Sequence, residues 1–239
     1  WSRPIQIASV QTLARREFPE TDLVIIDECH RLFETYIKWM AEKPRLPFIG
    51  LSATPWTRGL GNHFDDLIIS ATTQELIDAG HLSRFRVFAP AHPDLSRVSV
   101  VAGDYHEGQL SEAMSDTALV ADVVETWMKH GENRPTLVFA VDRAHAKKLQ
   151  NQFLEAGINA AYQDMRTPDH ERRAIKAGFH DGRYPVVCNV GTLTTGVDWD
   201  VRCIVMARPT RSEILFVQII GRGLRPKVGS PSDCLVLDH

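Results

Sequence analysis

The sequence predicts an α/β fold in which two units, each built on a parallel sheet, follow one another along the chain. Short apolar runs rich in valine and isoleucine alternate with segments whose apolar residues recur at helical spacing. This alternation is typical of parallel strands joined by helices. A length of 239 residues allows two modest domains, each with its own core.

The predicted first unit covers residues 1–84. It contains three strand candidates, one that begins near Ile5 and two at Leu23–Ile26 and Phe48–Leu51. Between the last two, apolar residues at helical spacing predict a helix; they are Leu32, Phe33, Tyr36, Ile37 and Met40. A segment with the chain-breaking residues Gly80, Pro90 and Pro93 links this unit to the next.

The predicted second unit covers residues 85–239. Its helix candidate is Ala144–Ala156, where apolar residues again fall on one face. Its strand candidates are buried-type apolar runs, which are Thr136–Val141, Pro185–Val190, Arg202–Ala207 and Cys234–Leu237. We expect these four strands to form one parallel sheet.

Composition narrows the class of protein further. An apolar fraction of 44% and a charged fraction of 24% are those of a globular chain. No apolar run approaches the ~18 residues of a membrane span, so we expect no membrane insertion. The four cysteines are widely scattered, which excludes zinc and redox motifs and favours reduced core residues of a cytoplasmic protein. A formal net charge of −3 is no signature of nucleic-acid binding, although a local groove remains compatible with it.

Two adjacent carboxylates, Asp27 and Glu28, follow the apolar run Leu23–Ile26. Ligands of open parallel sheets bind at the carboxyl ends of the strands. One carboxylate could therefore hold Mg²⁺ while the other orients a water. The alternative is an acidic turn that caps the next helix, since carboxylates are favourable at helix N-termini.

A second polar motif stands near the end of the chain. Arg222 and Arg225 are three residues apart, so their guanidinium groups lie near one face of a helix end. Planar guanidinium groups bind phosphate oxygens in a bidentate manner. The alternative is a solvated basic turn that ends at a glycine.

Taken together, the motifs resemble those of superfamily 2 nucleic-acid helicases and occur in the same order. Asp27–His30 is similar to the DEAD/DECH box, motif II, and Ser52–Pro55 to motif III. The later motifs IV, V and VI are matched by Thr136–Val141 with Arg143, by Gly196–Asp198 and by Gln218–Arg225. The resemblance implies two RecA-like domains in tandem. The DECH proteins related to UvrB, phage helicases and restriction translocases, most of which act on DNA, are the most similar subgroup.

The resemblance also implies a role for each motif residue in binding ATP and Mg²⁺. Asp27 is expected to hold Mg²⁺ through water, and Glu28 to activate the attacking water. Arg222 and Arg225, with Gln218 in the same motif, are expected to stabilise the γ-phosphate. The remaining residues expected at the nucleotide are His30, Gly196, Asp198 and Gly221.

Nucleic-acid contacts and coupling are implied by the same resemblance. Gln11 and Thr12 lie in a stretch similar to motif Ib, and with Arg143 and Thr192 they are the expected backbone contacts. Motif V departs from the DEAD-box pattern, since a valine, Val190, stands where that family has threonine. Ser52 and Thr54 of motif III are expected to couple the nucleotide state to nucleic-acid binding.

One expected motif is absent. A phosphate-binding loop requires G-x-x-x-x-G-K-[ST], and no Gly-Lys pair occurs in this chain. In the family this loop precedes motif Ib, which begins here almost at Trp1, so we expect an incomplete first domain and an inactive fragment of an ATP-dependent parent. The alternative is a non-catalytic nucleic-acid-binding or scaffold module derived from a helicase. The expected partners are DNA rather than RNA, together with nuclease or methylase subunits.

Overall fold

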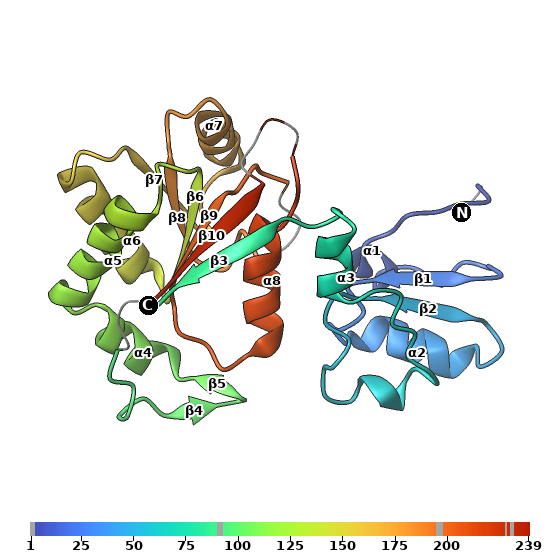
Figure 1. Cartoon of the computed structure of the whole chain (residues 1–239). Helices are drawn as coiled ribbons and strands as arrows, with labels where there is room; N and C mark the ends of the chain where they lie inside the picture. The colour runs from blue at the N-terminus through green and yellow to red at the C-terminus, as the bar shows by residue number, and fades with distance from the viewer. Residues whose placement is uncertain (1–2, 90–92, 195–197, 228, 230–231) are drawn as a thin grey trace. The chain divides into compact units, whose positions relative to one another are not determined.

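A computed structural model describes residues 3–89, 93–194, 198–227, 229 and 232–239 (Figure 1). Its contacts divide the chain into two compact units, Trp1–Ser70 and Ala71–His239. Each unit contains a parallel sheet, which confirms the predicted α/β class.

The first unit is built on two parallel strands. Its elements are α1 (Val10–Leu13), β1 (Val24–Asp27), α2 (Glu34–Glu42), β2 (Phe48–Leu51) and the 3-10 helix η1 (Leu60–Asn62). The strands pair from Val24 opposite Phe48 to Asp27 opposite Leu51. The third predicted strand, near Ile5, does not form. Ile5 and Ile7 are 83% and 97% exposed, so no packing holds them extended, and Ser9 instead caps α1.

The core of the first unit is aromatic. Trp39 of α2 stacks on Phe18 with ring centroids 4.8 Å apart and meets Phe48 of β2 edge-on at 5.7 Å. Gly50 is required by packing, because a Cβ there would lie 2.7 Å from the sulfur of Cys29 and 2.8 Å from the ring of Phe64. The helix α2 is therefore held against one face of the two strands.

The second unit is a six-stranded parallel sheet with strand order β3-β10-β9-β6-β8-β7. Its strands are β3 (Arg84–Phe88), β6 (Thr136–Ala140), β7 (Ala160–Gln163), β8 (Val186–Asn189), β9 (Cys203–Ala207) and β10 (Asp233–Asp238). Its helices are α3 (Thr73–Asp78), α4 (Glu107–Met114), α5 (Thr117–His130), α6 (Arg143–Glu155), α7 (Asp169–His180) and α8 (Glu213–Gly223). A short antiparallel hairpin joins β4 (Val100–Val101) to β5 (Asp104–Tyr105).

Helices cover both faces of this sheet. Trp127 of α5 and Phe153 of α6 belong to one buried cluster, and Phe179 of α7 and Ile219 of α8 belong to the other. The central strands are consequently buried on both faces, as the unbroken apolar runs predict. The four cysteines are buried and free, which confirms their predicted role as core residues. In the described part of the chain, no helix has the length and apolarity that a bilayer span needs.

The division between the units differs from the predicted one. Residues 71–84, which the sequence analysis assigned to the first unit, pack with the second. Leu82 lies against the core cluster beneath α7 and α8, and the backbone N–H of Ser83 donates to the Leu224 carbonyl at 2.6 Å. These contacts join residues about 140 positions apart, so the local signal at Gly80 could not reveal them.

Candidate functional site

The acidic motif stands at the carboxyl end of β1. Asp27 is the last residue of the strand, and one of its carboxylate oxygens accepts the Glu28 N–H at 3.0 Å. Glu28 has a φ of +53°, an uncommon value for a residue other than glycine. Backbone of this kind is found disproportionately at functional sites, where the surrounding structure maintains it. Here the next residue, Cys29, donates its N–H to the Leu51 carbonyl at 3.0 Å, which fixes the turn.

A chain of contacts connects this motif to Ser52 and Thr54. The Nδ1 atom of buried His30 lies 3.0 Å from the Ser52 hydroxyl and 3.3 Å from a carboxylate oxygen of Glu28. The same hydroxyl accepts the Thr54 N–H at 2.9 Å. The structure therefore brings together four residues of the predicted site from motifs more than twenty positions apart. His30 lies inside this chain of contacts, and its predicted contact with the nucleotide stays a prediction.

Asp27 fits a role in holding Mg²⁺. Mg²⁺ in nucleotide-binding proteins is commonly bound by one or two carboxylates together with substrate phosphates and waters. The Asp27 side chain is exposed, and a single hydrogen bond is recorded for it, so it can offer an oxygen to such an ion. Among the described residues, no three His, Cys, Asp or Glu side chains form a closed metal site. Asp27 would thus offer one oxygen ligand, and phosphates and waters would have to supply the others.

In the second unit, residues from motifs V and VI meet. A guanidinium nitrogen of Arg225 lies 3.2 Å from a carboxylate oxygen of Asp198, and both side chains are substantially exposed. Arg222, in the last turn of α8, donates from its Nε to the Gln218 carbonyl at 3.2 Å. Asp198 precedes β9, and Arg225 lies between the end of α8 and the start of β10. Because a helix between two parallel strands returns the chain to their amino ends, this group lies at the amino edge of the sheet. Gly196 lies outside the described residues.

The predicted nucleic-acid contacts of this unit lie at the opposite edge. Arg143 follows β6 and Thr192 follows β8, and these two strands are parallel neighbours in the sheet. The hydroxyl of Thr192 is buried with no hydrogen-bond partner in the described ranges. In the first unit, Gln11 and Thr12 lie in α1, where the Thr12 hydroxyl is 3.0 Å from that of Ser9.

Arg143 is already engaged by an acid. Its Nε donates to a carboxylate oxygen of Asp164, which also accepts the Tyr162 hydroxyl at 2.7 Å. Burial raises the pKa of Asp164, but the hydrogen bonds from Tyr162 and the Arg166 amide, with the Arg143 guanidinium, outweigh it and hold the pKa well below its usual range. Asp164 is therefore a carboxylate at neutral pH. A phosphate at this edge has to compete with it for Arg143.

Gly221 has no packing reason to be glycine. A Cβ added there would meet no atom of the described residues within 4 Å, whereas one added at Gly223, two residues on, would lie 2.2 Å from the sulfur of Cys234. Glycine inside a helix costs roughly 0.5–1 kcal/mol relative to alanine. The open space beside Gly221 is consistent with the predicted close approach of a nucleotide.

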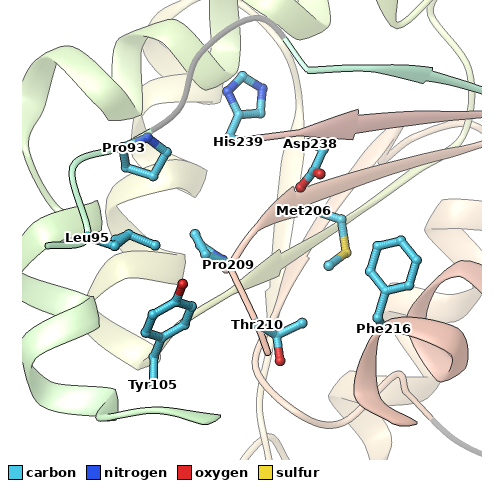
Figure 2. A pocket seen from close by; sticks show the side chains of 9 residues that line it. All are labelled: Pro93, Leu95, Tyr105, Met206, Pro209, Thr210, Phe216, Asp238 and His239. Atoms are coloured by element: carbon cyan, nitrogen blue, oxygen red, sulfur yellow. The ribbon is translucent and has the colours of Figure 1, made fainter. Parts of the chain in front are cut away.

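A pocket of about 230 Å³ opens at the carboxyl ends of β9 and β10 (Figure 2). None of the predicted site residues that the structure describes lines it. Its lining side chains are Pro93, Leu95, Tyr105, Met206, Pro209, Thr210, Phe216, Asp238 and His239. The pocket is thus separate from the Asp198–Arg225 group, which lies at the amino edge.

Arg202 was not predicted as a site residue, and it is 1% exposed although it is an arginine. A nitrogen of its guanidinium donates to the Arg225 carbonyl at 3.0 Å. The sequence does contain a signal for a buried ion pair at Arg202. This arginine stands directly before a buried strand and two residues after an aspartate. Its contact with Arg225 depends on the fold and has no local signal.

Comparison with known proteins identifies the family. Residues 118–227 match the model of the helicase conserved C-terminal domain. The chain is 30% identical over 211 residues to a 51.5 kDa protein of Lactococcus phage (isolate 7-9), covering 85% of this chain and 46% of that protein. It is 32% identical over 251 residues to the Saccharomyces cerevisiae protein named "Putative ATP-dependent helicase IRC3", covering 97% of this chain and 36% of the relative.

A solved structure agrees with this assignment. A fragment of a "putative HsdR subunit" of a type I restriction enzyme from Vibrio vulnificus YJ016 superposes with a TM-score of 0.67 at 25% identity. The match covers 92% of this chain and 43% of that one. The chain contains the helicase conserved C-terminal domain at residues 118–227, and over most of its length it is similar to superfamily 2 helicases. It spans less than half the length of these relatives.

Proposed function

We propose that the protein is an ATP-dependent helicase or translocase that acts on DNA. The observation that carries this proposal is that motif residues distant in sequence meet within each unit. His30 contacts both Glu28 and Ser52, and Asp198 pairs with Arg225. A shared catalytic role accounts for these contacts. A binding module, by contrast, does not need both the carboxylates of motif II and the arginines of motif VI.

In the proposed mechanism, Asp27 would hold Mg²⁺ through water, and Glu28 would accept a proton from the water that attacks the γ-phosphate. Mg²⁺, when bound, neutralises negative charge on the phosphate oxygens. The contact between His30 and Glu28 orients the carboxylate that acts as base. The link from His30 to Ser52 offers a route by which a change at the nucleotide reaches motif III.

The basic residues have a complementary role. Arg222 and Arg225 stabilise the charge that develops on the transferring phosphoryl group, a contribution worth roughly 10³–10⁵ in rate in related phosphoryl transfers. Gln218 supports Arg222 through the contact between its carbonyl and the Arg222 side chain. In the absence of nucleotide, Asp198 balances the charge of Arg225.

DNA is proposed over RNA because of the relatives. One is named as a type I restriction enzyme endonuclease subunit of Escherichia coli, 26% identical over 241 residues, and the HsdR fragment belongs to the same enzyme class. Partner subunits with nuclease or methylase activity are part of the proposal. Nucleic-acid contacts are assigned to Gln11, Thr12, Arg143 and Thr192.

The test is the Glu28→Gln substitution in the natural full-length protein, with ATP hydrolysis measured with and without DNA and with RNA in parallel. We expect ATP and DNA binding to persist while kcat falls by at least ~10²-fold, the usual effect of removing a general base. Glu34→Gln is a matched control, since Glu34 is an exposed carboxylate in the first turn of α2. Equal turnover in the Glu28 and Glu34 variants would count against the proposal.

The same experiment addresses the alternative, a non-catalytic binding or scaffold module. This alternative is retained because the chain contains no Gly-Lys pair and hence no phosphate-binding loop of the expected kind. It predicts that the wild-type full-length protein binds DNA but neither binds nor hydrolyses ATP.

A further inference from the structure

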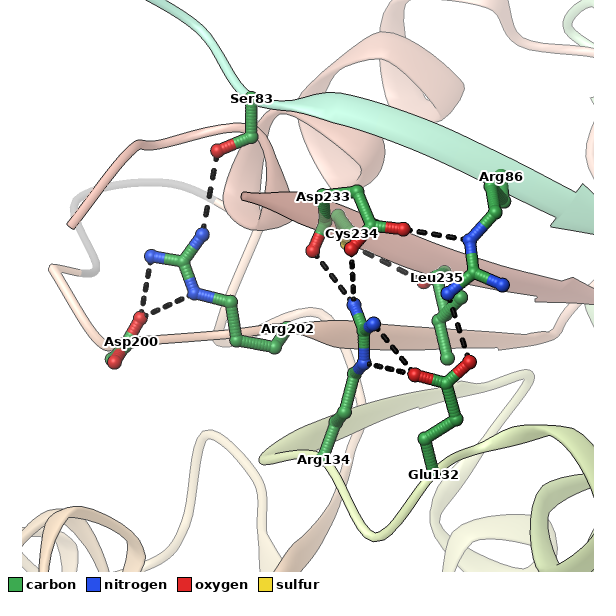
Figure 3. A network of polar contacts seen from close by, with 9 residues as sticks. All are labelled: Ser83, Arg86, Glu132, Arg134, Asp200, Arg202, Asp233, Cys234 and Leu235. Atoms are coloured by element: carbon green, nitrogen blue, oxygen red, sulfur yellow. Dashed lines mark hydrogen bonds and ion pairs between the residues drawn. The ribbon is translucent and has the colours of Figure 1, made fainter. Parts of the chain in front are cut away.

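The end of α8 receives hydrogen bonds from two other parts of the second unit, and Figure 3 shows the two donor residues, Ser83 and Arg202. The last carbonyls of a helix have no partner within the helix and need donors from elsewhere. Ser83 supplies its backbone N–H to the Leu224 carbonyl at 2.6 Å. Arg202 supplies a guanidinium nitrogen to the next carbonyl, that of Arg225, at 3.0 Å.

Arg202 is itself held firmly. Its backbone N–H donates to the Pro135 carbonyl and its carbonyl accepts from Leu235, so the residue is anchored between two neighbouring strand segments. Its guanidinium forms an ion pair with Asp200 at 2.6 Å. A guanidinium is planar and rigid, so a fixed Arg202 also fixes the position of the carbonyl it binds.

Ser83 makes a second contact in this group. Its hydroxyl accepts from a guanidinium nitrogen of Arg202 at 3.3 Å, while its N–H binds Leu224. Ser83 belongs to the segment that leads along the chain from the first unit into β3. One residue of this segment therefore contacts both the helix end and the arginine that positions it.

We infer that Arg202 is a positioning residue for Arg225, and that Ser83 connects the segment entering the second unit to the same helix end. The inference rests on the proposed function, in which Arg225 acts on the γ-phosphate. A shift of the segment at Ser83 changes the hydrogen bonds of both Arg202 and Leu224. The Arg225 side chain then loses its alignment, and hydrolysis depends on where the linking segment lies.

Arg134 provides a matched control in the same unit. It is 9% exposed, forms ion pairs with Glu132 at 2.6 Å and Asp233 at 2.9 Å, and donates to the Asp233 carbonyl at 2.8 Å. Like Arg202, it is a buried arginine bound to carboxylates and to one backbone carbonyl (Figure 3). Its carbonyl partner lies at the start of β10 rather than at the end of α8.

The test compares Arg202→Lys, Ser83→Ala and Arg134→Lys in the natural full-length protein. Lysine keeps the positive charge but lacks the planar fork. For Arg202→Lys we expect kcat to fall about 10- to 100-fold, the size expected for a misplaced catalytic group. For Ser83→Ala, which removes one hydroxyl hydrogen bond, we expect a fall of about two- to fivefold. In both variants KM for ATP changes little, whereas Arg134→Lys leaves kcat near the wild-type value.

A second measurement does not depend on hydrolysis. Amide hydrogen exchange of residues 222–227 should become about tenfold faster in Arg202→Lys and measurably faster in Ser83→Ala, but not in Arg134→Lys. Equal exchange and equal kcat in the Arg202 and Arg134 variants would overturn the inference. If the wild-type protein hydrolyses no ATP, the proposed function fails, and the exchange pattern still decides whether Arg202 and Ser83 position the helix end.

Discussion

At the scale of single residues, burial changes the chemistry of His145. The side chain is fully buried at the start of α6, and its Nδ1 accepts the Val141 N–H at 3.4 Å. Burial lowers the pKa of His145 to about 4, while the charges of Asp142 and Lys148 act in opposite directions. The ring is therefore neutral in the folded protein at pH 7.

This shift predicts a loss of stability in acid. In the unfolded chain His145 binds a proton near pH 6.5, whereas in the folded chain it does so only near pH 4. The free energy of unfolding therefore has its full value above pH 6.5 and decreases as pH falls toward 4. At pH 5 the loss is about 2 kcal/mol. Urea unfolding followed by tryptophan fluorescence at pH 7 and pH 5 measures it. His145→Gln, which stays neutral and keeps an acceptor, should show a smaller difference, and parallel losses in both proteins would contradict the prediction.

At the scale of elements, α8 contains two glycines with opposite constraints. Gly223 faces the sulfur of Cys234 and the side chain of Ile204, so the helix can approach β9 and β10 only without a Cβ at that position. Gly221 faces open space. Packing thus explains one glycine, and the proposed nucleotide contact explains the other.

Alanine at each position separates these explanations. Gly221→Ala should raise the free energy of unfolding by about 0.5–1 kcal/mol, because alanine lowers the backbone entropy of the unfolded chain and causes no clash in the helix. The same substitution should lower the rate of ATP hydrolysis. Gly223→Ala should lower it by about 1–3 kcal/mol, since the added methyl overpacks the core. Thermal unfolding and ATPase assays on the natural full-length protein test both. An unchanged ATPase rate in Gly221→Ala would remove the case for a close nucleotide approach.

At the scale of the whole molecule, the six-stranded sheet separates two sets of polar residues. Asp198 and Arg225 lie at its amino edge, whereas Arg143 and Thr192 follow strands at its carboxyl edge. On the proposed assignment, the phosphates of a nucleic acid and of a nucleotide would contact different side chains. An ATP-dependent helicase or translocase would need such a division, because it has to hold both ligands at once.

The division predicts the salt dependence of DNA binding. When phosphate contacts dominate binding, the logarithm of the binding constant falls linearly with the logarithm of the salt concentration. Arg143→Gln should reduce the slope of this line by about 1. Arg183→Gln is the control, because Arg183 is an exposed arginine paired with Asp181 at 3.0 Å in the loop between α7 and β8. Fluorescence anisotropy with a labelled duplex from 50 to 200 mM salt gives the slopes. A slope unchanged in the Arg143 variant would exclude a phosphate contact there.

The fold class and most strands could be predicted from local patterns. A strand that is buried on both faces has an unbroken apolar run, such as Thr136–Val141, and this run can be recognised from the sequence alone. The structure confirms this run as a buried strand. The β7 strand, Ala160–Gln163, and the hairpin of β4 and β5 were missed because their residues carry no comparable run. The prediction of a strand near Ile5 was wrong, and the exposed side chains of Ile5 and Ile7 show that this stretch is not packed into a sheet.

By itself the sequence determined the family, the motif residues and the α/β class, since these depend on residue types and short spacings. Only the tertiary structure decided which of those residues meet: His30 with Glu28 and Ser52, Asp198 with Arg225, and Arg143 with Asp164 rather than free in solvent. It also revealed Arg202 and Ser83 at the end of α8. The reason is physical: hydrogen bonds and ion pairs act over a few ångströms, and folding brings residues as far apart as Ser83 and Leu224 within that range.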